Sequence, residues 1–132
     1  MTRSGMVDAL HETHRVVRKG GIVVDARPDS RVLARVERVG RSLGTIGTRR
    51  ETAGDDVLSD RALATVKRER LFTSLRAGRF WHHIRFADRA ELEGYLHDHL
   101  RLAHQVRWTT RPDTAEPLEI VRAVRYELLR RV

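Results

Sequence analysis

The sequence predicts an α/β protein, in which a small mixed sheet of about three main strands plus a hairpin is flanked by helices. Three observations indicate this class. Near residue 20 an amphipathic helix passes through two glycines into a short β-branched strand. Apolar and polar residues alternate with a period of two over residues 31–47 and again over residues 80–86. Between these segments the apolar residues recur with helical spacing.

The first helix is expected to end in a glycine turn. Its apolar face has helical spacing and consists of Val7, Leu10, His14 and Val17. Cations that complement the helix dipole follow at its end, namely Arg15, Arg18 and Lys19. Gly20 can adopt the left-handed conformation that ends a helix. Ile22, Val23 and Val24 then predict a buried strand, so this junction indicates one αβ step of a parallel sheet.

The remaining elements follow from alternation, spacing and capping residues. Residues 31–39 and 42–47 predict a hairpin, and residues 48–54 a loop. A helix is expected to about residue 74, with Asp55, Asp56 or Ser59 able to start it. Asp88 and Glu91 have the spacing of a capping box before a helix that reaches residue 103. After a loop over residues 108–117, the tail over residues 118–130 fits either a strand or a helix.

The stretch from Ala9 to Asp29, ALHETHRVVRKGGIVVDARPD, resembles a segment of class I S-adenosylmethionine-dependent methyltransferases, of the methyltransferase type 11 kind. In that family a helix with a basic end and a Gly-Gly turn leads into the fifth strand, although Lys19 stands where proline is usual. Weaker similarity continues at Leu71-Phe72, residues 80–86, Glu91 and Tyr95-Leu96. The resemblance implies the C-terminal half of a Rossmann-like methyltransferase sheet, with the tail as an antiparallel strand.

The cofactor-binding half of that family is not found in these 132 residues. The family holds its cofactor on a glycine-rich turn after the first strand, but only 19 residues precede Gly20 and none forms such a unit. Gly40, Gly44 and Gly47 lie in the predicted hairpin and are interpreted as turn glycines. We therefore expect a single domain over residues 1–132 that is a truncated or split methyltransferase, not catalytic alone. It would bind S-adenosylmethionine only when the missing half completes it.

Two residue pairs are candidates for the substrate pocket. Asp25 and Arg27 lie at the carboxyl end of the predicted strand, where α/β folds bind their ligands. The alternative is a surface ion pair at a turn. His82 and His83 are candidate acid or base groups, or ordinary strand residues that point to opposite faces. The sequence predicts no catalytic, cofactor-binding or metal-binding residue.

Composition and charge suggest a location and a second function. The chain has no cysteine and no long apolar run, which favours a cytoplasmic protein without membrane association. Its net charge of +8 favours a small basic module for nucleic acid or an acidic protein as the alternative function. An apolar strand edge over residues 22–26 would lie open in a half sheet. We therefore expect a homodimer, or a partner chain that covers this edge.

Overall fold

The computed structural model describes residues 3–47, 49–99, 106–113 and 115–132, which form two compact units. Unit 1 comprises Met1–Pro28, Thr52–Arg79 and Arg125–Val132, and unit 2 comprises Asp29–Glu51 and Phe80–Val124. In the described part of the chain, no helix is both long and apolar enough to cross a membrane.

The described residues form three helices and six strands. The helices are α1 (Arg3–Val16), α2 (Arg49–Arg68) and α3 (Arg89–His99). The strands are β1 (Ile22–Pro28), β2 (Ala34–Arg38), β3 (Arg41–Ile46), β4 (Phe72–Phe86), β5 (Val106–Trp108) and β6 (Leu118–Arg131). The α/β class is therefore confirmed, and the tail is a strand, as the family resemblance implies.

The strands form a mostly antiparallel sheet in the order β1-β6-β2-β3-β5, and β4 also pairs with β6. At one end of β6 the Gly20 N–H donates to the Arg131 carbonyl at 3.0 Å, and the Arg131 N–H donates to the Gly21 carbonyl at 2.9 Å. The Val132 N–H donates to the Leu71 carbonyl, at the start of β4, at 3.0 Å. The C-terminal end of β6 therefore lies beside the N-terminal ends of β1 and β4, and β6 runs antiparallel to both.

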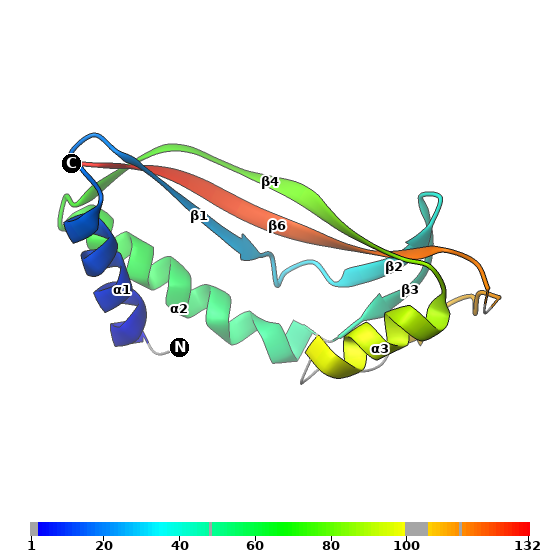
Figure 1. Cartoon of the computed structure of the whole chain (residues 1–132). Coiled ribbons are helices and arrows are strands. Elements are labelled where there is room, and N and C mark those ends of the chain that lie inside the picture. The colour runs from blue at the N-terminus through cyan, green and yellow to red at the C-terminus, as the bar shows by residue number, and fades with distance from the viewer. Residues whose placement is uncertain (1–2, 48, 100–105, 114) are drawn as a thin grey trace. The chain divides into compact units, whose positions relative to one another are not determined.

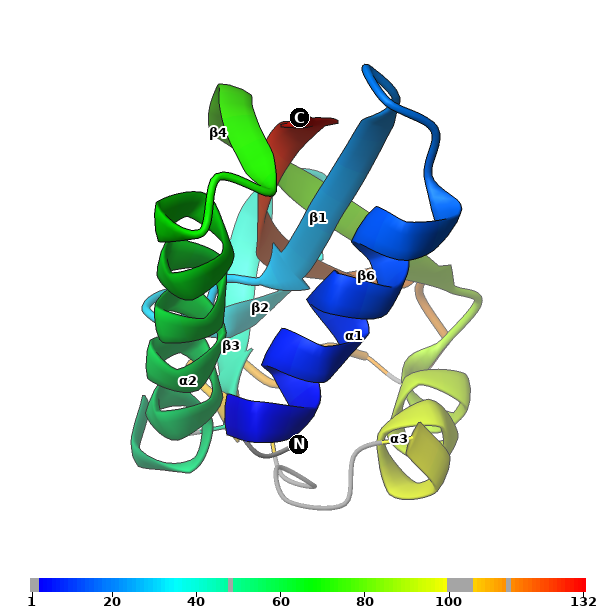
Figure 2. The ribbon, with the colours of Figure 1, turned by 90° about the vertical axis from the view of Figure 1, so that its left-hand side faces the viewer.

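In unit 1 both helices pack on one face of the strands, as Figure 1 and Figure 2 show. Leu63 and Val66 of α2 meet Phe72 of β4 and Leu129 of β6 in a buried cluster. Leu10 of α1, Val23 of β1 and Leu71 pack against this cluster. These apolar side chains lie between the helices and one face of the strands. Their burial stabilises the unit because it removes apolar surface from water.

Unit 2 packs α3 on one face of its strands. Leu92 and Leu96 of α3 are buried with residues from β2, β3, β4 and β6, namely Val36, Leu43, Ile46, Phe86, Leu118 and Ile120. The predicted capping box starts this helix, because the Glu91 N–H donates to the Asp88 carboxylate at 2.9 Å. The Glu91 carboxylate in turn accepts the Ala87 N–H at 2.7 Å.

Several predicted boundaries are wrong. Helix α1 ends at Val16, before the predicted glycine turn, and α2 begins at Arg49 inside the predicted loop. Helix α2 also ends six residues early, because Arg70 adopts a φ of 60° and breaks it. Residues 72–74 of the predicted helix, together with residues 75–79 after them, instead belong to β4. Trp108 belongs to β5 and not to a loop, and residues 100–105 of the predicted third helix lie outside the described part.

The strand after the Gly-Gly turn also differs from its prediction. Its closest neighbour, β6, is antiparallel, so the junction is not a step between adjacent parallel strands. Strand β1 is at the end of the strand order and alternates between exposed and half-buried residues. Ile22 and Val24 are 49% and 62% exposed, while Val23 packs in the core. Helices cover only one face of this strand, so only the side chains on that face are removed from water. The predicted fully buried strand is therefore buried on one face alone.

Candidate functional site

The outer face of unit 2, opposite α3, carries a cluster of charged side chains. Alternate residues of its strands are buried under α3, so the residues between them point to the other face. These are Arg35 and Glu37 of β2, Trp81, His83 and Arg85 of β4, and Glu119 of β6. We call this group the outer-face cluster.

Two glutamates lie directly opposite each other at the centre of this cluster. Glu37 and Glu119 are cross-strand partners in the antiparallel pair of β2 and β6. Their side chains are only 10% and 20% exposed. Like charges in directly opposed positions destabilise a sheet, because such positions bring their Cβ atoms to about 5 Å. The sheet therefore keeps an unfavourable pair at this point, and nearby cations must compensate it.

The compensating cations are unequally placed. His83 Nδ1 lies 3.2 Å from the Glu119 carboxylate, and the Arg85 guanidinium lies 3.9 Å from it. Glu37 has the Arg35 guanidinium at 3.5 Å as its cation. Arg35 also stacks on the Trp81 ring, with 4.8 Å between the guanidinium carbon and the ring centroid. Glu37 is thus the more buried of the two glutamates, and in the described part of the chain it pairs with one cation, which also stacks on Trp81.

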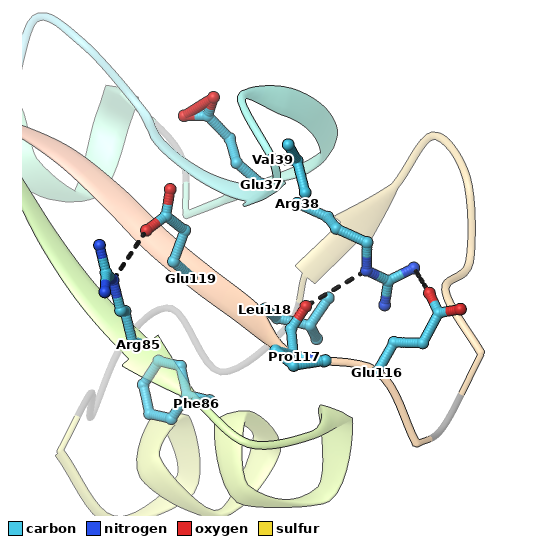
Figure 3. Close-up of a pocket in the computed structure, with 9 residues that line it drawn as sticks. All are labelled: Glu37, Arg38, Val39, Arg85, Phe86, Glu116, Pro117, Leu118 and Glu119. Atoms are coloured by element: carbon cyan, nitrogen blue, oxygen red, sulfur yellow. Dashed lines mark hydrogen bonds and ion pairs between the residues drawn. The ribbon is translucent and has the colours of Figure 1, made fainter.

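A pocket of about 500 Å³ opens beside these residues (Figure 3). Its apolar lining comprises Val39, Phe86, Pro117 and Leu118, and its charged lining comprises Glu37, Arg38, Arg85, Glu116 and Glu119. Arg38 is held at the rim, because it pairs with Glu116 and its Nε donates to the Pro117 carbonyl at 3.2 Å. A pocket with an apolar wall and a few charged groups is the usual form of a small-molecule site.

The predicted pair Asp25 and Arg27 forms an ion pair in unit 1. Arg27 Nη2 lies 3.0 Å from the Asp25 carboxylate and 3.5 Å from that of Asp60 in α2. Arg125 of β6 also reaches Asp60, at 2.5 Å. The ion pair that the sequence indicated is present, and it joins β1, β6 and α2. A substrate-binding role for this pair stays a prediction.

The predicted pair His82 and His83 lies in unit 2, on strand β4. Only His83 belongs to the outer-face cluster. His82 has the parity of Ile84, which packs against the core on the α3 side. The two histidines therefore point to opposite faces, as their adjacency predicts.

The sequence interpretation missed Glu37 and Glu119. Glu119 lies between two apolar residues, whereas Glu37 lies between Val36 and Arg38, and both settings are ordinary for a strand. The register between β2 and β6 brings them together across 82 residues of sequence, and no local pattern could have indicated that. A signal existed only for Glu119, which lies between two core residues of its strand, Leu118 and Ile120.

No protein-family model matches the sequence, and neither a curated protein nor a solved structure matches it. Among the described residues no group of three or more His, Cys, Asp or Glu side chains could hold a metal ion. The candidate site is therefore defined by its own geometry and charge.

Proposed function

We propose that this chain is the acceptor-binding part of an S-adenosylmethionine-dependent methyltransferase, and that a second polypeptide segment with the cofactor-binding half joins it along β1. The observation that carries the proposal is the open edge of β1. This strand follows the helix and Gly-Gly turn that resemble the family, pairs with an antiparallel tail strand on one side, and exposes Ile22 and Val24. An open apolar edge is a site for strand pairing.

The proposal assigns cofactor binding to the joining segment. Strand β3 passes towards α2 through the single Gly47, and the sequence contains no GxG turn. The proposal therefore has the backbone amides that would approach the cofactor supplied by the joining segment. The acceptor would bind in the pocket beside the outer-face cluster. Since Glu37 is nearly buried with one shared cation, we infer that the acceptor carries a basic nitrogen.

Calorimetric titration with S-adenosylmethionine tests the division into halves. The 132-residue chain alone is expected to show no binding at micromolar cofactor. When co-expressed with a segment that carries the strand–GxG–helix unit, encoded upstream or elsewhere, it is expected to bind. Val24→Lys should abolish this complementation by placing a charge on the open edge, while Val57→Lys, at an exposed position of helix α2, should not.

Two results would contradict the division. One is micromolar binding of the cofactor by the chain alone. The other is a homodimer in light scattering that Val24→Lys dissociates and Val57→Lys leaves intact, since the open edge would then pair with a second copy of the chain.

The acceptor pocket is tested separately with small probes that share one carbon skeleton. Phenethylamine is expected to raise the melting temperature more than 2-phenylethanol or phenylacetate, because only the amine can pair with Glu37. The difference should vanish in Glu37→Gln and persist in Glu93→Gln, whose side chain pairs with Arg89 on α3 away from the pocket. Equal effects of all three probes would contradict a basic acceptor.

A further inference from the structure

Positive charge is concentrated in unit 1. Its segments contain fourteen Lys and Arg against eight Asp and Glu, a net charge of +6, whereas unit 2 has twelve against ten, a net charge of +2. The two units are of similar length, so the basic character of the chain is largely a property of unit 1. Whether this positive charge forms one continuous patch depends on where the cations of unit 1 lie.

The cations of unit 1 gather where both helices and β6 end. His14 Nε2 of α1 lies 3.4 Å from the Val132 carbonyl, and the Val132 N–H bonds to Leu71 just after α2. Figure 2 shows the C-terminus at the same end of the unit as the two connections that leave α1 and α2. Five exposed cations lie on these segments, Arg18, Lys19, Arg68, Arg70 and Arg130. We call them the basic end.

The basic end is not neutralised from within the unit. The acids of the same segments are already occupied, since Glu12 pairs with Arg15, Glu69 with His11 and Glu127 with Lys67. In the described residues none of the five cations forms an ion pair, and Arg68 donates only to the Thr65 hydroxyl, at 3.3 Å. Exposed, unpaired cations therefore accumulate at this end.

Compensation of helix dipoles does not account for five cations. Each helix C-terminus is equivalent to roughly half a negative charge, so the ends of α1 and α2 together offset about one cation. About four positive charges remain, and their mutual repulsion disfavours the folded unit. A polyanion that binds here would relieve this repulsion.

We propose that the basic end binds the phosphate backbone of double-stranded nucleic acid, without sequence readout. Four of its five cations are arginines, whose planar guanidinium groups bind phosphate oxygens in pairs. Unit 1 contains only two aromatic residues, the buried Phe72 and the half-buried Tyr126, so it offers little surface on which unpaired bases could stack. This inference is independent of the proposed methyltransferase role.

Fluorescence anisotropy with a labelled DNA duplex of about 20 base pairs tests the proposal, and the salt dependence is its signature. If all five cations contact phosphates, log K falls against log salt with a slope of about −4.5, or a loss of a few hundredfold between about 50 and 200 mM salt. The variant Arg18→Gln/Lys19→Gln/Arg130→Gln is expected to reduce the slope to about −2.

A matched control separates this surface from net charge. The control Arg41→Gln/Arg107→Gln/Arg111→Gln removes three exposed cations of unit 2, so it lowers the net charge of +8 by as much as the first variant does. Its slope of log K against log salt should stay within about one unit of the wild-type slope. Circular dichroism checks that both variants fold. If the triple variant of the basic end does not fold, Lys19→Gln and Arg130→Gln are measured singly, each with an expected loss of about 0.9 in slope.

Three results would overturn the proposal. The first is no duplex binding at about 50 mM salt, where backbone contacts are strongest. The second is an equal loss in the control variant, which would assign binding to overall charge. The third is competition by polyglutamate as effective as that of unlabelled duplex at equal charge, which would indicate an acidic protein as the partner.

Discussion

The Lys67 ammonium group contacts the Glu127 carboxylate and thereby ties helix α2 to strand β6. The Glu127 side chain is only 18% exposed. Burial on its own would raise the pKa of Glu127, but the hydrogen bonds from Lys67 and Ser74 and the positive charge of Lys67 outweigh it. The pKa of Glu127 is therefore lowered from its usual value of 4.5. The ionised form is stabilised specifically in the folded unit.

This contact predicts a pH-dependent contribution to stability. A carboxylate whose pKa is lower in the folded than in the unfolded state stabilises the fold above its unfolded-state pKa, and this contribution is lost as the pH falls through the folded-state pKa. We expect Glu127→Gln to lower the free energy of unfolding by about 1 kcal/mol at neutral pH, and by much less near pH 3. Urea unfolding at both pH values measures the difference. Glu12→Gln, in a fully exposed pair with Arg15, should change stability little, and an equal loss there would contradict the role of burial.

Replacement of the two glycines of the first turn is expected to lower the free energy of unfolding for two different reasons. Gly20 has a φ of 78° and open space around its Cα, so Gly20→Ala should cost about 1 kcal/mol through backbone strain. Gly20→Asn should cost less, because Asn tolerates this conformation. A Cβ on Gly21 would lie 2.8 Å from the Arg18 carbonyl oxygen, so Gly21→Ala should cost about 1–3 kcal/mol and Gly21→Asn no less. Thermal unfolding of the four variants tests this order, and a Gly21→Asn variant as stable as Gly20→Asn would contradict it.

Val39 is expected to be a poor residue for the turn between β2 and β3. It has a φ of 50°, is 98% exposed, and is followed by Gly40 with a φ of 75°. Such hairpin turns favour Asn-Gly, because both positions need positive φ. Val39→Asn should therefore raise the free energy of unfolding by about 1 kcal/mol. The control Val24→Asn, at an exposed position with ordinary strand geometry, should give no gain, and a gain there would contradict the turn argument.

Gly44 allows the close approach of β3 and β5. It pairs with Trp108, and a Cβ would lie 2.6 Å from the Arg107 carbonyl oxygen, a backbone atom that cannot move without breaking the ladder. Gly44→Ala should cost about 1–3 kcal/mol and weaken amide protection in residues 106–108. Gly94→Ala, at an uncrowded helical position in α3, should instead stabilise by about 0.5–1 kcal/mol. Hydrogen exchange and urea unfolding measure both, and an unchanged Gly44→Ala would refute the close packing.

Local signals in the sequence were sufficient for several elements. The capping residues Asp88 and Glu91 start α3, and Gly20 adopts the positive φ expected at the end of the first helical segment. Period-two alternation located the hairpin of β2 and β3 within a few residues. In each case the residues that make the decisive contact are neighbours in sequence, so their chemistry is visible without the fold.

Longer-range contacts decided where local signals conflicted. The pattern of residues 58–74 predicts a helix, yet the positive φ at Arg70 and the pairing with β6 make the chain from Phe72 onward part of β4. The tail fitted both a helix and a strand, and became a strand because β1, β2 and β4 supply its hydrogen-bond partners. Intrinsic preference is weak, and partner strands routinely override it.

The sequence by itself predicted the α/β class and the Gly-Gly turn, and it offered the ion pair of Asp25 with Arg27 as one of two interpretations. The turn and the ion pair depend on residues close together in the chain. Only the tertiary structure decided that Glu37 lies opposite Glu119, and that the C-terminal ends of α1, α2 and β6 bring five cations to one end of unit 1. Strand register and the meeting of chain ends arise from pairing between distant segments. No local sequence pattern therefore indicates which charged residues these pairings bring together.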